Sequence, residues 1–132
     1  MKRQFLILLF VSCLVAACSS KHNSLAKSNQ GTIVCINSHY YGGNVERNDN
    51  ASLPFSFELC NYQDTIIGIE NVEPSCGCLH FTMTPREIRP KQKSTIKGYM
   101  ELKGQRGHVS KSIFVTLDDG SVIQLRVICD LK

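Results

Sequence analysis

Hydrophobic and polar residues alternate with a period of two over most of the chain after residue 31, and this is the repeat of a β-strand that buries one face. In the clearest run, 53–60, every second residue is apolar: Leu53, Phe55, Phe57 and Leu59. Similar alternation or a β-rich composition predicts further strands at 32–36, 65–72, 94–102, 109–117 and 121–131. No stretch has the 3.6-residue repeat of an amphipathic helix.

Turn signals separate these runs. Asp118, Asp119 and Gly120 predict a tight turn between the last two strands, with glycine where a positive φ is needed. Segment 40–50 is rich in Gly, Asn and Asp, and we expect it to be a loop. Six or seven short strands separated by such turns predict an all-β domain, an antiparallel β-sandwich.

The amino-terminal residues have a different pattern. Lys2 and Arg3 precede an almost unbroken apolar run over 5–17, which is too short for a membrane-spanning helix of roughly 20 apolar residues. A basic start, a short apolar run and small residues at its end are typical of a secretory signal peptide. Because Cys18 follows two alanines, the segment resembles a bacterial lipoprotein signal. This resemblance implies cleavage after Ala17 and a diacylglycerol on the Cys18 thiol, with acylation of the new amino terminus.

The sequence therefore predicts three parts: a lipoprotein signal peptide at 1–17, a lipidated cysteine and flexible tether at 18–31, and one β-sandwich domain at 32–132. The polar segment 19–31 has too few apolar residues to form a core. Two or more acyl chains hold a protein stably on a bilayer. We expect the domain to lie outside the cytoplasm, in a bacterial cell envelope. The sequence does not distinguish inner from outer membrane.

Composition narrows the class of partner. The 132-residue chain has a formal charge of +4, which falls to +2 without Lys2 and Arg3, and the charges of both signs are interspersed. The basic residues are densest over 86–97, which we expect to be a solvent-exposed loop and the start of a strand. No aromatic residues are interleaved with a basic patch, and the expected location is outside the cytoplasm. Both features argue against nucleic-acid binding.

The middle of the chain carries a family resemblance. Four features follow one another in order along the chain. They are a strand at Phe55–Asn61, a second run at Ile69–Cys78 that ends in Ser-Cys-Gly-Cys, a turn at Ile88–Lys91, and late strands that begin near Gly107 and continue through Ile113–Val115. This pattern resembles the domain-of-unknown-function family 1573, which consists largely of exported bacterial proteins, many of them lipoproteins.

The resemblance covers roughly 51–130 and implies an immunoglobulin-like sandwich of about seven strands. It implies no chemistry, because the family has none assigned. The sequence departs from the pattern at two positions: Lys91 stands where the family usually has Gly, and Leu79 stands where a small polar residue often follows the second cysteine.

The cysteines of the mature chain are odd in number, so at least one thiol is left over or pairs with another chain. They are Cys35, Cys60, Cys76, Cys78 and Cys129 after the lipidated Cys18. The alternation places Cys129 on the core face, as a small buried hydrophobe. A disulfide to Cys35 is the alternative, because the first and last strands can be neighbours and an exported compartment permits disulfides. For Cys60 we expect packing alone.

Cys76, Gly77 and Cys78 allow three interpretations. The cysteines can be structural, with Gly77 permitting a bend or bulge at a strand end. They can form a strained, redox-active Cys-Gly-Cys ring. Or, if the strand continues, Cys76, Cys78 and His80 share one face and can bind Cu(I) or zinc.

The sequence contains no Gly-x-Ser-x-Gly, no His-Glu-x-x-His and no glycine-rich phosphate loop. Our leading hypothesis is therefore a lipid-anchored, non-enzymatic envelope protein that needs no cofactor, whose β-sandwich binds or scaffolds an envelope protein. The alternative is a thiol-redox or Cu(I)-handling protein that acts through Cys76, Cys78 and His80.

Overall fold

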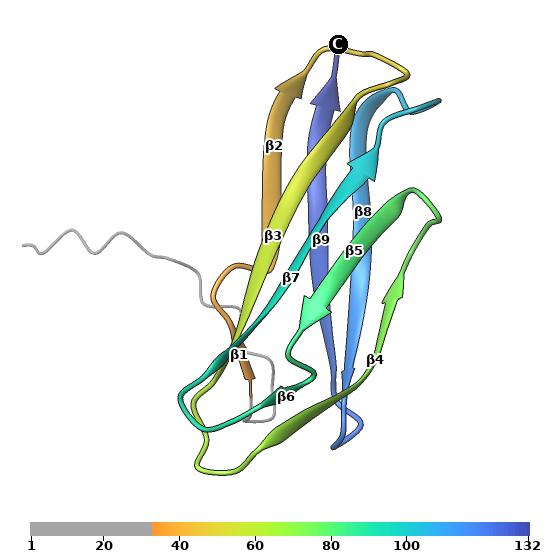
Figure 1. The fold of residues 1–132 in the computed structure, drawn as a ribbon. Coiled ribbons are helices and arrows are strands. Elements are labelled where there is room, and N and C mark those ends of the chain that lie inside the picture. The colour runs from red at the N-terminus through yellow and green to blue at the C-terminus, as the bar shows by residue number, and fades with distance from the viewer. Residues whose placement is uncertain (1–32) are drawn as a thin grey trace, which may run out of the picture.

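The computed structural model describes residues 33–132, with side chains from residue 36 onward. The predicted signal peptide, Cys18 and the whole tether predicted at 18–31 lie outside these residues. The described part folds into two packed sheets of strands (Figure 1). Its nine strands are β1 (Ile33–Cys35), β2 (His39–Val45), β3 (Ser52–Asn61), β4 (Ile67–Pro74), β5 (Leu79–Thr84), β6 (Glu87–Ile88), β7 (Lys93–Glu101), β8 (Gly107–Leu117) and β9 (Val122–Leu131).

One sheet has the order β1-β3-β7-β5, and the other has the order β2-β9-β8-β4-β6. These orders match the A-B-E-D and G-F-C sheets of an immunoglobulin-like sandwich. The expected fold class is confirmed. Two details differ from the expectation: the described strands number nine rather than about seven, and β2 pairs with β9 in parallel rather than antiparallel.

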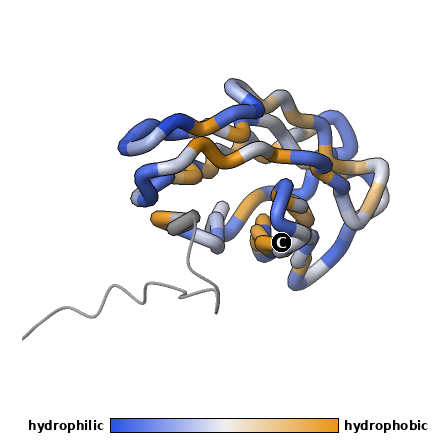
Figure 2. Tube along the Cα trace, turned by 90° about the horizontal axis from the view of Figure 1, so that it is seen from below, coloured by the Kyte–Doolittle hydropathy of each residue, from blue (hydrophilic) through white to orange (hydrophobic). Residues whose placement is uncertain are grey.

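The core lies between the sheets and is built from the predicted alternation. Figure 2 shows hydrophobic and hydrophilic positions alternating along the chain. All four apolar residues of the 53–60 run are buried. The largest side chains with almost no exposed surface include Phe57, Leu59, Ile96, Met100, Ile113, Leu117 and Leu125. The Asp118–Gly120 turn also forms as predicted, with Gly120 at φ 81° and its N–H donating to the Leu117 carbonyl at 2.9 Å.

Segment 40–50 was expected to be a loop, and this expectation is wrong for its first half, which belongs to β2. The register of β2 against β9 shifts between Tyr41 and Asn44, and Gly43 within the shift has φ 70°. Glycine is common in loops, but it also occurs in β-bulges, where the backbone on either side stays paired. The glycine content of this segment therefore suggested a loop where the structure has a bulged strand. The other glycine, Gly42, lies so close to the Leu53 side chain that a Cβ there would clash with it.

The proposed Cys35–Cys129 disulfide is also wrong. The pairing assumed that the first and last strands are neighbours, but β1 pairs with β3, whereas β9 lies in the other sheet and its Cys129 is not bonded to another cysteine. Cys129 is a free, buried thiol within the core cluster, which confirms the expectation of a small buried hydrophobe. Cys60 is likewise free and buried.

The sandwich has two ends, which the registers define. At the Asn61 end, β1 begins where β3 finishes, because Ile33 pairs with Asn61. At the opposite end, Ser52 of β3 lies beside Glu101 of β7, and β9 finishes at Leu131 beside Gly107. We name this the disulfide end, because Cys78, which forms a disulfide with Cys76, lies beside Glu101. Figure 1 shows β1 and the carboxyl terminus at opposite ends of the domain.

Lys91 occupies the glycine position of the turn noted in the sequence, and its backbone has φ 61°. A left-handed conformation strains an L-residue but not glycine. We predict that Lys91→Gly raises the free energy of unfolding by about 0.5–1 kcal/mol, measured by urea denaturation. The control is Lys97→Gly, an exposed position within β7, which is expected to destabilise because glycine weakens a strand. Equal effects of the two changes would contradict the strain argument.

Candidate functional site

The Ser-Cys-Gly-Cys segment forms the connection from β4 in one sheet to β5 in the other. It is fixed to both sheets. On one side the Ser75 N–H donates to the Ser112 carbonyl at 2.8 Å, and the Ser112 N–H donates to Ser75 Oγ at 2.9 Å. On the other side the Glu101 N–H donates to the Cys78 carbonyl at 2.8 Å. These bonds hold the connection in place between β7 and β8.

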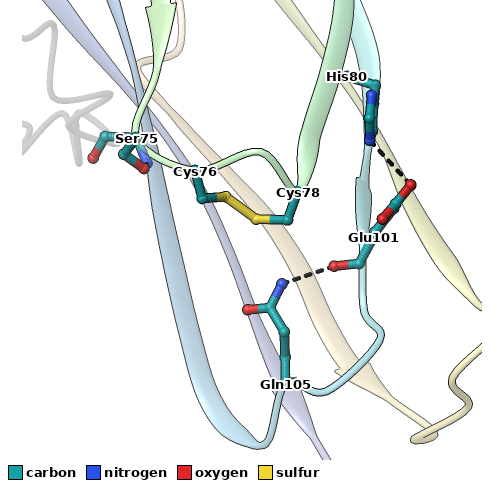
Figure 3. Close-up of a disulfide and its surroundings, with 7 residues drawn as sticks. Ser75, Cys76, Cys78, His80, Glu101 and Gln105 are labelled. Atoms are coloured by element: carbon teal, nitrogen blue, oxygen red, sulfur yellow. Dashed lines mark hydrogen bonds and ion pairs between the residues drawn. A yellow bond between two sulfur atoms is a disulfide. The ribbon is translucent and has the colours of Figure 1, made fainter.

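Cys76 and Cys78 form a disulfide in this connection (Figure 3). Both residues are half-buried at the border of the core rather than within it. A Cβ added at Gly77 would have no heavy atom within 4 Å, and its φ is not in the left-handed region. The bend that the sequence suggested is present at 75–78, but it does not need glycine at position 77 for space or for backbone conformation.

His80 does not join the two sulfurs on one strand face, because Cys76 and Cys78 precede β5 and lie in a turn. Instead its Nε2 lies 3.0 Å from Glu101 Oε1, and its ring stacks on Tyr99 with centroids 4.9 Å apart. In residues 33–132 no three His, Cys, Asp or Glu side chains are arranged to hold a metal ion. The copper hypothesis requires reduced thiolates, so it stays a prediction for the reduced chain.

An open depression of about 520 Å³ lies beside the disulfide. Its lining combines the two cysteines with the loop between β7 and β8 and the first residues of β8. The lining residues are Cys76, Cys78, Lys103, Gly104, Gln105, Arg106, His108, Val109, Ser110 and Lys111. Three of these side chains are permanent cations and none is a carboxylate, so the depression suits an anionic group.

Two contacts set the shape of this loop. Gln105 Nε2 donates to the Glu101 carbonyl at 2.7 Å (Figure 3). The Gln105 N–H donates to the Leu102 carbonyl at 3.1 Å. Gly104 and Gly107 have φ of 72° and 62°, a backbone conformation that favours glycine at both positions. His108 Nδ1 lies 2.8 Å from Asp130 Oδ1.

Sequence reasoning did not select the cations of this depression. Lys103, Arg106 and Lys111 follow a predicted strand and are interrupted by glycines, a composition that indicates only an exposed turn. Their importance comes from lying beside Cys76 and Cys78, which are more than twenty residues away in sequence and are brought there by the packing of the two sheets.

The four cysteines whose side chains the structure describes should differ in reactivity toward alkylating reagents. Burial raises the pKa of the Cys129 thiol, and Asp130 adds to the effect. We predict that Cys60 and Cys129 resist iodoacetamide until the domain unfolds, whereas Cys76 and Cys78 are labelled quickly after mild reduction. Mass spectrometry of the labelled peptides, with and without reductant, checks this. Fast labelling of Cys60 or Cys129 in the native domain contradicts it.

Comparison with known proteins gives one family. The family described as "Protein of unknown function (DUF1573)" matches residues 19–128. No curated protein matches the chain. In the part of the chain that the structure describes, no helix has the length and hydrophobicity needed to cross a membrane.

Three solved structures resemble the domain. A protein of unknown function from Porphyromonas gingivalis W83 is 14% identical with a TM-score of 0.64, over 76% of this chain and 47% of that one. The VesB protease of Vibrio cholerae is 10% identical with a TM-score of 0.52, over 70% and 30%. The periplasmic chaperone SfaE is 11% identical with a TM-score of 0.50, over 76% and 57%. The chain spans less than two thirds of each of these proteins, and at these identities the likeness concerns the fold alone.

Proposed function

Because the chain belongs to the DUF1573 family, which is described as of unknown function, we propose a function from its own residues: it is a lipid-anchored protein of the bacterial cell envelope. Its β-sandwich is non-enzymatic and binds an envelope protein at the disulfide end.

One observation carries the binding role. The depression with Lys103, Arg106 and Lys111 lies at the disulfide end, whereas the chain enters the sandwich at the Asn61 end through β1. A tether from Cys18 therefore joins the domain at the end remote from the depression. The cations are then available to a partner, and charge complementarity favours one that presents carboxylates.

The anchor is supported by the basic start, the short apolar run and the Ala16-Ala17-Cys18 sequence. We predict that Cys18→Ser moves the chain from the detergent-extracted membrane fraction to the soluble fraction and abolishes labelling by radioactive palmitate. Ser19→Ala is the control and should leave both unchanged. A Cys18→Ser chain that still incorporates palmitate would disprove the proposed anchor.

The binding role is tested by capture from membranes solubilised in mild detergent, followed by mass spectrometry. Replacing Lys103, Arg106 and Lys111 with Gln should abolish capture of the partner, and salt should weaken capture by the unaltered chain. The matched control replaces Arg86, Lys91 and Lys97 with Gln, which removes the same charge elsewhere on the exposed surface. Equal capture by both triple variants, or no partner at all, contradicts the proposal.

A second candidate function, thiol–disulfide exchange, is favoured by the half-exposed disulfide in the same cationic depression. A thiolate of a partner dithiol would attack one sulfur of the Cys76–Cys78 bond and release the other as a thiolate. The second partner thiol would then resolve the mixed disulfide, so the partner loses two electrons and this chain gains them. Cations beside a thiol favour its thiolate form.

This candidate has its own test. Alkylation of reduced Cys76 and Cys78 at pH 7 should be slower when Lys103, Arg106 and Lys111 are replaced by Gln, because the thiolate loses neighbouring positive charge. The triple variant at Arg86, Lys91 and Lys97 should react at the unaltered rate. Identical rates in all three chains would rule out an activated thiol pair.

A further inference from the structure

Two large apolar side chains stand exposed in the loop that joins β3 to β4. Tyr62 is 67% exposed and Ile66 is 56% exposed. Both lie at the Asn61 end, on the side of the domain remote from the depression. Tyrosine combines an apolar ring with a polar tip and is enriched where protein meets the interface of a membrane.

A buried side chain fixes the loop that presents them. Asn61 is fully buried, and its Nδ2 donates to the carbonyls of Thr65 and Ile88, each at 2.7 Å. Its Oδ1 accepts from the Gln63 N–H at 2.8 Å. These hydrogen bonds fix the backbone of the 62–66 loop from the buried side. The fold therefore holds Tyr62 and Ile66 in exposed positions.

Cations lie directly beside this loop. The Lys91 N–H donates to the Asn61 carbonyl at 2.8 Å, and both Arg89 and Lys91 are exposed. A lysine occupies position 91 although its φ of 61° would favour glycine, and strained residues concentrate at functional sites. Asp64 is the one carboxylate of the 62–66 loop.

The chain also enters the domain here. Ile33 pairs with Asn61, and fourteen residues, 19–32, separate it from Cys18. Even a fully extended segment of this length spans at most about 50 Å. A lipid on Cys18 therefore limits the distance of this end, with its apolar and basic side chains, from the bilayer to about 50 Å.

We propose that the Asn61 end docks on the bilayer that holds lipidated Cys18. Tyr62 and Ile66 enter the boundary between headgroups and acyl chains, and Arg89 and Lys91 contact anionic headgroups. This inference rests on the lipid anchor of the proposed function. Docking in this orientation directs the disulfide end away from the membrane.

The chain has no tryptophan, so a single introduced one reports its own environment. The experiment uses the full lipidated protein in vesicles that contain phosphatidylglycerol and lipids brominated near the top of the acyl chain. Tyr62→Trp is compared with Tyr41→Trp, which lies on β2 away from the Asn61 end and is similarly exposed at 71%. We expect the emission of Tyr62→Trp to shift to shorter wavelength and to be quenched, and that of Tyr41→Trp to do neither.

The outcomes separate the two proposals. A chain that fails to co-sediment with the vesicles overturns the anchor and the docking together. A chain that co-sediments while Tyr62→Trp emits as in water, or while both variants are quenched equally, overturns the docking alone.

The headgroup contact is tested by adding Lys91→Glu to Tyr62→Trp, which should reduce quenching. Lys97→Glu, a change of equal charge within β7, should not. Equal quenching in these two chains overturns the contribution of anionic headgroups.

Discussion

Replacing Asn61 with alanine is expected to lower the free energy of unfolding by about 3 kcal/mol or more, because it leaves buried or half-buried backbone groups without partners. The side chain satisfies the carbonyls of Thr65 and Ile88 and the N–H of Gln63, and it has no exposed surface. Each unsatisfied buried group costs about 1–3 kcal/mol, and bonds that share one side chain are lost together.

Urea denaturation of the Cys18→Ser chain measures this change without interference from the lipid. Asn48→Ala is the control, because Asn48 is exposed and accepts one loop bond, from the Asn50 N–H at 2.9 Å. Its effect should stay within about 0.5 kcal/mol, as for most surface positions. A loss in Asn61→Ala no larger than that of Asn48→Ala would show that the network does not hold this end of the sandwich.

The second large effect is expected for Gly98→Ala. Gly98 is half-buried on β7, and its register partners are Phe55 on β3 and Phe81 on β5. An alanine Cβ would overlap the His80 carbonyl oxygen and crowd the Phe81 backbone. A backbone cannot move aside as a flexible side chain can, so β5 would have to separate from β7. We expect a loss at or above the upper end of the range of about 1–3 kcal/mol that overpacking costs.

Gly77→Ala is the matched control, because it adds the same methyl group where nothing lies within 4 Å. It should leave the denaturation midpoint nearly unchanged. Circular dichroism and urea denaturation of both variants give the comparison. If Gly98→Ala were as stable as Gly77→Ala, β5 would not pack against β7 as closely as described.

The sequence pattern located most strands, because a strand that buries one face alternates apolar and polar residues. The run at 53–60 became β3 (Ser52–Asn61) and the run at 121–131 became β9 (Val122–Leu131). Pattern failed in β2, which contains two glycines and a bulge and is held by backbone pairing rather than by a buried face. β5 does alternate, with Leu79 buried and Phe81 and Met83 packed against the core, but it is a short edge strand and was not among the predicted strands.

The candidate site was likewise predicted only in part from the sequence. The Cys-Gly-Cys spacing drew attention to Cys76 and Cys78, but the prediction that they share a strand face with His80 assumed that the strand continued. The chain instead passes from one sheet to the other at that point, and His80 turns toward Glu101. The resemblance to the DUF1573 pattern included Asn61, whose buried network only the tertiary structure explains.

The sequence by itself determined the all-β class, the inward face of each long strand and the family, because local periodicity and short motifs suffice for these. Only the tertiary structure placed Lys103, Arg106 and Lys111 around the disulfide. It also set Lys91 against Asn61, at the start of the loop that carries Tyr62 and Ile66. Such neighbours come from segments far apart in the chain. Strand pairing and sheet packing bring them together, and a local pattern contains no information on that arrangement.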